Sequence, residues 1–144
     1  MTLSFYKKAT RILIVSLVLL TACKKNKTDQ IPLVAVNITI NINNPQYINL
    51  TTVSGWDYVI GGSRGIVVYR ANQDEFKAYE RHCPYNPKES CGRVDVDSSN
   101  VKLIDACCNS EFLITDGSVL SGPSVSPLKQ YETSFDGNTL RIYN

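Results

Sequence analysis

The stretch DACCNSEFLITDGSVLSGPSVSPLKQYETSFDGNTLRIYN, residues 105–144, contains most of the information about the fold. Its apolar runs are short and are separated by polar residues, glycine or proline. Two Asp-Gly pairs, Asp116-Gly117 and Asp136-Gly137, lie between such runs, and Asp-Gly is a strong signal for a β-hairpin turn. The stretch therefore predicts several short antiparallel strands.

The residues upstream continue this pattern. From Val34 to Ile42, apolar side chains alternate with polar ones, which is the period of a half-buried strand. GWDYVIGG (55–62), GIVVYR (65–70) and EFKAYER (75–81) are further β-rich runs. No window has the spacing of an amphipathic helix, so we predict an all-β domain, a small sandwich or barrel.

The N-terminus has the composition of an export signal. Lys7, Lys8 and Arg11 precede or border the apolar run ILIVSLVLL (12–20), which is typical of a signal peptide. The run is too short to span a bilayer as a mature helix. It ends in LTAC (20–23), which resembles the lipobox of bacterial lipoproteins.

That resemblance implies cleavage before Cys23 and lipidation of its sulfur. Residues 1–22 are then a lipoprotein signal peptide, residues 23–32 a lipidated cysteine and flexible tether, and residues 33–144 the domain. The expected location is the bacterial cell envelope, on the periplasmic face or at the outer membrane, with the membrane and an envelope protein as partners. The alternative is an ordinary signal peptide with an incidental cysteine.

The charge balance argues against nucleic acid as a partner. The chain has 15 basic and 13 acidic residues, and loss of Lys7, Lys8 and Arg11 leaves 12 against 13, a net charge of −1. No basic patch or stripe of the kind that binds phosphate backbones is visible in the sequence.

Export also changes how the cysteines are interpreted, because exported compartments allow disulfides. Four cysteines remain after Cys23: Cys83, Cys91, Cys107 and Cys108. An even number suits two bridges, and four cysteines allow three connectivities. A bridge between the neighbours Cys107 and Cys108 would leave the loops untied.

The second half of the chain resembles the Rieske iron–sulfur family. In that family Cys-x-His follows a strand reading like FxAYxR, and Cys-x-x-His-Gly-Ser-x-Phe leads into DGxxLxGPxxxPLxxY and a final strand. The corresponding stretches here are EFKAYERHCPY (75–85) and residues 105–144, in which SGPSVSPL (121–128) resembles the proline loop that covers the cluster. The resemblance implies a Rieske-like all-β fold with two cysteine-bearing loops.

The cluster-ligand positions differ from the family pattern. Cys-x-His becomes Cys83-Pro84-Tyr85, and counting back from Phe112 places Asp105 at the second cysteine and Cys108 at the second histidine. A Rieske centre needs two thiolates on one iron and two imidazoles on the other. His82 is the one histidine in the chain and precedes Cys83. We therefore expect no cofactor, with a [2Fe–2S] cluster on substituted ligands as the alternative.

The resemblance also implies how the cysteines pair. Cys83 and Cys108 occupy opposing ligand positions, whereas Cys91 and Cys107 resemble the extra pair that forms a loop-tying disulfide in some Rieske proteins. The implied bridges are Cys83–Cys108 and Cys91–Cys107. The crossed pairing of Cys83 with Cys107 and of Cys91 with Cys108 stays open on the sequence alone.

Three chemical roles compete with this structural interpretation. A four-cysteine metal site would need four thiolates in tetrahedral array, without the usual Cys-x-x-Cys spacing. A redox-active disulfide would need an exposed cysteine of low pKa. A His82–Cys83 dyad would need neighbouring side chains on a strand to face each other. The sequence thus predicts a non-enzymatic, disulfide-stabilised envelope protein.

Overall fold

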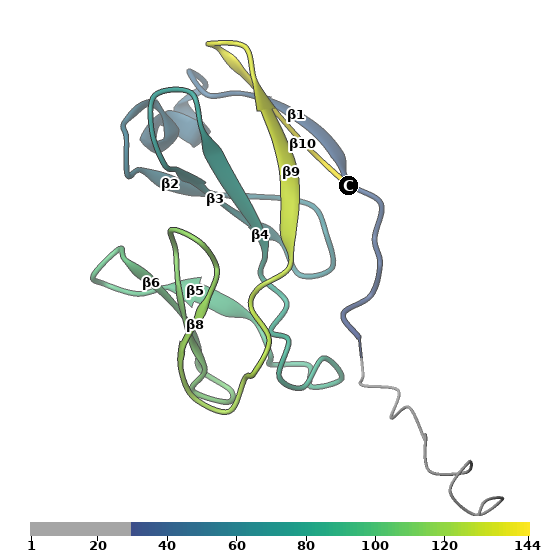
Figure 1. Cartoon of the computed structure of the whole chain (residues 1–144). Helices are drawn as coiled ribbons and strands as arrows, with labels where there is room; N and C mark the ends of the chain where they lie inside the picture. Colours follow the sequence, from purple (N-terminus) through teal and green to yellow (C-terminus); the bar gives the residue numbers. More distant parts are fainter. Residues whose placement is uncertain (1–29) are drawn as a thin grey trace, which may run out of the picture.

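The computed structural model describes residues 30–144. The predicted signal peptide, Cys23 and the tether up to residue 29 lie outside this range. The described residues form two antiparallel sheets joined by loops, with one 3-10 helix (Figure 1). This confirms the all-β prediction. Among residues 30–144, no helix has the length and apolarity needed to cross a bilayer.

The larger sheet has six strands and the smaller sheet has four. The larger runs in the order β1 (Asn37–Asn41), β10 (Thr139–Tyr143), β9 (Gln130–Phe135), β4 (Phe76–Glu80), β3 (Ile66–Arg70) and β2 (Trp56–Val59). The smaller runs β5 (Val94–Val96), β6 (Lys102–Asp105), β7 (Glu111–Leu113) and β8 (Val119–Ser121). The 3-10 helix η2 (Pro45–Thr51) precedes β2.

The two predicted hairpins are present. Asp116-Gly117 lies between β7 and β8, and Asp136-Gly137 lies between β9 and β10. Both glycines have positive φ, +72° at Gly117 and +100° at Gly137, a conformation that side chains with a Cβ rarely adopt. The turn chemistry therefore makes β7 a neighbour of β8 and β9 a neighbour of β10.

Strand β3 is buried on both faces, because it lies between two hydrophobic clusters. All five of its residues are buried. Ile66 and Val68 pack into a core with β1, β10 and Tyr131, whereas Val67 and Tyr69 face a second core with Leu103 and Phe112 of the smaller sheet. Because successive strand residues point to opposite faces, a continuous apolar run joins the two layers.

The N-terminal strand is shorter than its sequence pattern indicates. The alternation begins at Val34, but β1 begins at Asn37, where pairing with β10 starts. Val34 is exposed, whereas Val36, Ile40 and Ile42 are buried. The pattern identified the buried face, but the extent of the partner strand determines where the strand begins.

The carboxylate of Glu80, at the end of β4, is fully buried and accepts four hydrogen bonds. Oε1 accepts from the backbone N–H of Arg64 at 2.9 Å and of His82 at 3.0 Å. Oε2 accepts from the N–H of Ser63 at 2.6 Å and from the Tyr131 hydroxyl at 2.7 Å. Burial, and then the Glu80 carboxylate, raise the pKa of Tyr131, so the phenol stays protonated as the donor.

This network fixes the segment between β2 and β3 against the end of β4. Gly62 lies there with φ of +64°, and a Cβ on it would lie 2.3 Å from Glu80 Oε2. Glycine is therefore required both by the backbone conformation and by the close approach of the carboxylate.

We predict that Glu80→Gln lowers the free energy of unfolding by about 1–3 kcal/mol, because an amide turns one acceptor into a donor that faces buried N–H or O–H groups. Tyr131→Phe removes only one of the four donors and should cost about 1 kcal/mol. Denaturant unfolding of the full-length chain measures both. A Glu80→Gln variant as stable as the wild type would contradict the role assigned to this carboxylate.

Candidate functional site

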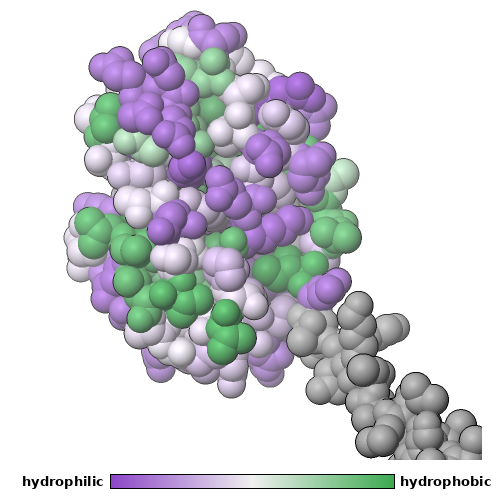
Figure 2. All heavy atoms as spheres, in the orientation of Figure 1, coloured by the Kyte–Doolittle hydropathy of each residue, from purple (hydrophilic) through white to green (hydrophobic). Residues whose placement is uncertain are grey.

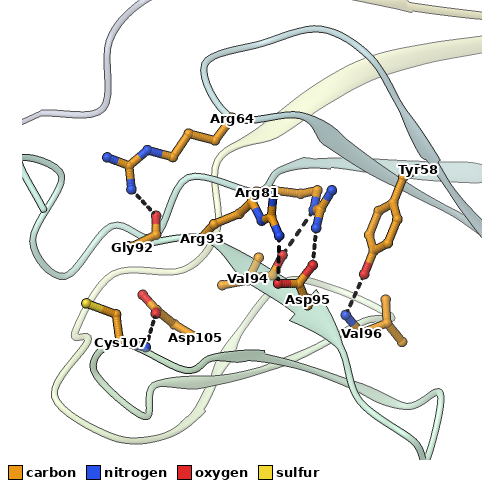
Figure 3. A network of polar contacts seen from close by, with 10 residues as sticks. All are labelled: Tyr58, Arg64, Arg81, Gly92, Arg93, Val94, Asp95, Val96, Asp105 and Cys107. Atoms are coloured by element: carbon orange, nitrogen blue, oxygen red, sulfur yellow. Dashed lines mark hydrogen bonds and ion pairs between the residues drawn. The ribbon is translucent and has the colours of Figure 1, made fainter. Parts of the chain in front are cut away.

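The first loop, residues 82–92, leaves β4 and returns to β5. An isolated bridge between His82 and Arg93 closes its base, and the N–H of Cys83 donates to the carbonyl of Gly92 at 3.0 Å. The guanidinium of Arg64 donates to the carbonyls of Gly92 and Glu89, each at 2.5 Å (Figure 3 shows the first). These bonds fix a loop whose prolines exclude regular structure.

The second loop, residues 105–110, connects β6 to β7. The N–H of Cys107 donates to Asp105 Oδ1 at 2.7 Å (Figure 3), and the N–H of Asn109 donates to the Asp105 carbonyl at 2.7 Å. Asn109 stands where the family motif has glycine and has φ of +59°. Asparagine tolerates this left-handed conformation better than most residues.

The proline loop packs against the second loop. The N–H of Ser124 donates to the Ser110 hydroxyl at 3.1 Å, and a Cβ on Gly122 would lie 2.6 Å from the backbone of Asn109 and Ser110. The absence of a side chain at Gly122 allows this contact between the two backbones. The segment SGPSVSPL thus lies beside the site, as the resemblance implies.

The four cysteines lie where the two loops meet. The structure contains a disulfide between Cys91 and Cys107, with a Cα–Cα distance of 5.7 Å. Cys83 and Cys108 are free thiols whose Sγ atoms are 3.7 Å apart. The crossed pairing and a four-cysteine metal site are therefore both wrong for this structure. The Cys83–Cys108 bridge stays a prediction, with its two sulfurs already neighbours.

At three of the four cluster-ligand positions, the side-chain donor atoms lie close together. Cys108 Sγ is 3.4 Å from Asp105 Oδ2, and the donor atoms of Cys83, Asp105 and Cys108 all lie within 4.8 Å of one another. Cys83 and Asp105 are each 1% exposed. Tyr85, at the fourth position, is 50% exposed and lines a hollow of about 230 Å³ beside Asp105 and Cys108.

His82 does not reach this group. It is 3% exposed, Nδ1 lies 2.9 Å from the Ser63 hydroxyl, and Nε2 lies 2.7 Å from the Pro87 carbonyl. Because a carbonyl only accepts, Nε2 carries the hydrogen and Nδ1 accepts from Ser63. Burial lowers the pKa of His82 and favours this neutral form. Both ring nitrogens are occupied, so neither a ligand role nor a dyad with Cys83 is available.

The thiol of Cys83 is held protonated in the absence of a cation. Burial raises its pKa, and the nearby Asp105 carboxylate and Cys108 thiol add to the effect, while the N–H of Tyr85 opposes it. A thiol with a raised pKa is a poor nucleophile, because the thiolate is the reactive form. The environment of Cys83 thus argues against nucleophilic chemistry.

The larger half of the molecule holds β5, the strand that follows the first loop, through Arg81 and Tyr58 (Figure 3). Arg81 Nε donates to the Val94 carbonyl at 3.0 Å, and its guanidinium forms an ion pair with Asp95 and lies 3.6 Å from the centre of the Tyr58 ring. The Tyr58 hydroxyl accepts from the N–H of Val96 at 2.8 Å. These contacts hold β5, a strand of the smaller sheet, against the larger sheet.

Comparison with solved structures identifies the fold. The cyanobacterial plasma membrane Rieske protein PetC3 from Synechocystis PCC 6803 matches with a TM-score of 0.55 and 22% sequence identity, over 74% of this chain and 99% of that one. No protein-family model matches the sequence, and no curated protein sequence matches it. The domain is therefore Rieske-like in fold, and the expectation drawn from the residue pattern is confirmed.

The donor set does not fit a Rieske-type [2Fe–2S] cluster. Such a cluster needs two pairs of ligands, one pair on each iron, and two of the four ligands are imidazoles. Here three donor atoms converge on one point, and the ring of His82 is bound elsewhere. The spacing of the three donors is that of a site for one ion.

Several residues that position the site were not identified from the sequence. Arg64 lies outside the motifs and Glu80 falls at a variable position, although a signal existed for Glu80; Arg81 is the arginine of the FxAYxR-like stretch, but no supporting role was predicted for it from the sequence. Phe76, Ala78 and Glu80 share one face of β4 because alternate strand residues do, so a carboxylate was placed on an otherwise apolar face. The partners of Arg64 are carbonyls 23 to 28 residues away, which no local pattern encodes.

We predict that the double substitution Cys91→Ser and Cys107→Ser lowers the free energy of unfolding by about 3 kcal/mol, because a crosslink closing a loop of this length restricts the unfolded chain. Denaturant unfolding of the full-length chain measures the loss. Ala106→Ser, an exposed change in the same loop, is the matched control and should have little effect. Equal stability of the double variant and the control would contradict the prediction.

Proposed function

We propose that this chain is a lipid-anchored bacterial envelope protein whose Rieske-like domain is cluster-free and disulfide-stabilised and has a binding or structural role. It is proposed to be a non-enzyme. The observation that supports this most strongly is the replacement of the ligand set by Cys83, Asp105 and Cys108, without an imidazole. A domain without the cluster lacks the group that transfers electrons in this fold.

The disulfide replaces the crosslink between the two loops that a bound cluster would provide. A cluster joins the two loops through its ligands, and Cys91–Cys107 joins the same loops covalently. Under oxidising conditions we propose a second bridge between Cys83 and Cys108, supported by the 3.7 Å between their sulfurs. Together these bonds would hold the site without metal.

The anchor rests on the sequence of residues 1–23. The basic start, the apolar run and LTAC before Lys24 support lipidation of Cys23. Acyl chains contribute about 0.8 kcal/mol per buried methylene, so a lipid with several chains holds a protein at a membrane face. The polar stretch from Lys24 onward would then act as a spacer.

A partner in the envelope is supported by apolar side chains exposed on the smaller half of the molecule. Leu120, Val125 and Val101 are 46%, 95% and 57% exposed. Figure 2 shows several hydrophobic groups on this half, on the face drawn. Leu120 and Val125 flank Gly122, which packs on the second loop, so the proposed binding surface is continuous with the site.

The second candidate is a [2Fe–2S] electron carrier with Tyr85 and Asp105 as substituted ligands. It is favoured by the fold and by the convergence of Cys83, Asp105 and Cys108. The half-exposed position of Tyr85 and the single-ion spacing of the other donors count against it.

We predict that the full-length chain, purified from bacteria without air or reductant, has no visible absorption from iron–sulfur charge transfer and contains neither iron nor sulfide. Absorption spectroscopy with iron and acid-labile sulfide analysis measures this. A Rieske protein with the full ligand set, expressed in the same cells, is the control for cluster assembly. Stoichiometric iron and sulfide in this chain would support the electron-carrier candidate instead.

We predict that Cys23→Ser abolishes incorporation of labelled fatty acid and releases the chain from the membrane fraction, because the acylated sulfur is lost. Fatty-acid labelling and membrane fractionation measure the effect. Cys108→Ser is the matched control and should keep both the label and the membrane location. A Cys23→Ser chain that still carries the label would disprove the proposed anchor.

A further inference from the structure

The three donor atoms at the former ligand positions lie within 4.8 Å of one another, and two of their separations match those of a single tetrahedral metal site. In such a site Zn–S distances are about 2.3 Å and Zn–O about 2.0 Å, which places two sulfurs about 3.8 Å apart and sulfur and oxygen about 3.5 Å apart. Here Cys83 Sγ and Cys108 Sγ are 3.7 Å apart, and Cys108 Sγ and Asp105 Oδ2 are 3.4 Å apart. One ion could therefore contact all three with little movement.

The surrounding backbone orients these donors. Asp105 Oδ1 accepts the N–H of Cys107, which leaves Oδ2 to face the sulfurs. Hydrogen bonds of this kind to the second oxygen of a ligand carboxylate are typical of metal sites. Cys107 is itself tied to Cys91, and the N–H of Cys83 is bonded to Gly92. The two loops that carry the donors are thus fixed to each other without any metal.

The fourth position of the tetrahedron is accessible. Asp105 and Cys108 line the hollow of about 230 Å³ together with Tyr85, Asn86 and Glu89. Three protein ligands and one open position are the arrangement of zinc sites that hold a water or another ligand. The hollow is large enough for a water and polar enough to bond it.

The donor types favour zinc. Thiolates select zinc, copper(I) or iron–sulfur clusters, whereas a carboxylate is a hard ligand that copper(I) does not favour. Two thiolates and one carboxylate carry three negative charges, which a divalent cation largely offsets. Binding would release one proton from each thiol, because only the thiolate is a ligand.

We propose that Cys83, Cys108 and Asp105 bind one Zn²⁺ ion when the two thiols are reduced, with the fourth position open to the hollow beside Tyr85. The inference rests on the cluster-free state in the proposed function. It also links the site to the second disulfide, because a Cys83–Cys108 bridge and a zinc ion use the same two sulfurs. The bridged form should bind no zinc.

The test uses the full-length chain, purified without air in the state of the structure, with Cys83 and Cys108 as thiols and Cys91–Cys107 as a disulfide, and freed of metal with a chelator. Titration with Zn²⁺, followed by metal analysis after desalting, should give one zinc per chain. Co²⁺ in place of Zn²⁺ should give sulfur-to-cobalt charge-transfer absorption, which reports thiolate ligands directly. Alkylation after denaturation, with mass analysis, should count two free thiols, Cys83 and Cys108, and in the folded chain zinc should protect the partly exposed Cys108 from alkylation.

Three variants make the test specific. Cys108→Ser should abolish stoichiometric binding, and Asp105→Asn, which keeps the acceptor for the Cys107 N–H, should weaken it at least about tenfold. Glu111→Gln removes a carboxylate from the neighbouring strand β7 and should bind as the wild type does. Near-ultraviolet circular dichroism without metal establishes that each variant keeps the fold.

The outcomes separate failure of the zinc site from failure of the proposed cluster-free state. Zinc bound equally by Cys108→Ser and Asp105→Asn would place the ion elsewhere and overturn the site. Cys83 and Cys108 both counted as free thiols, with no zinc retained, would overturn it as well. Iron and sulfide in the chain as purified would instead overturn the cluster-free state, so failure of the proposed function is told apart from failure of the zinc site.

Discussion

The buried carboxylate of Glu80 is the constraint on which the arrangement of the site depends. It ends β4, and its four donors come from the 62–64 segment, from His82 and from β9. A buried charge is tolerated when hydrogen bonds satisfy it, and an incomplete set would cost the full desolvation penalty. The donors, Arg64 among them, are therefore held together, and Cys83, which follows His82 directly in the chain, takes a fixed position.

From this junction the support extends to both loops. Arg64 holds the first loop by its carbonyls, and Arg81 holds β5 through Val94 and Asp95. The disulfide between Cys91 and Cys107 then ties the second loop to the first. In a Rieske-like fold whose cluster ligands are replaced, this combination of buried polar bonds and one covalent link keeps the loops facing each other. The proposed zinc site and the proposed second bridge both depend on that preformed arrangement.

Much of the fold and part of the site could be predicted from local sequence. Asp116-Gly117 and Asp136-Gly137 identified two hairpins, because their turn geometry is a property of two adjacent residues. The distance of Asp105 and Cys108 from Phe112 placed them at matched ligand positions, and the structure brings them together with Cys83. By contrast, the contacts of Arg64 and Tyr131 could not be predicted from local sequence. Their partners are backbone and side-chain atoms far away in the chain, which only the packing of the fold brings near.

The sequence by itself determined the class of fold, the absence of an imidazole at the ligand positions and the number of cysteines available for bridges. These follow from residue identity, turn chemistry and alternation along each strand. The tertiary structure decided which cysteines are joined, the 3.7 Å approach of Cys83 to Cys108 and the burial of Glu80 and His82. The physical reason is that sulfur–sulfur distances and desolvation depend on how two loops, one joining the two sheets and one within the smaller sheet, are brought into contact.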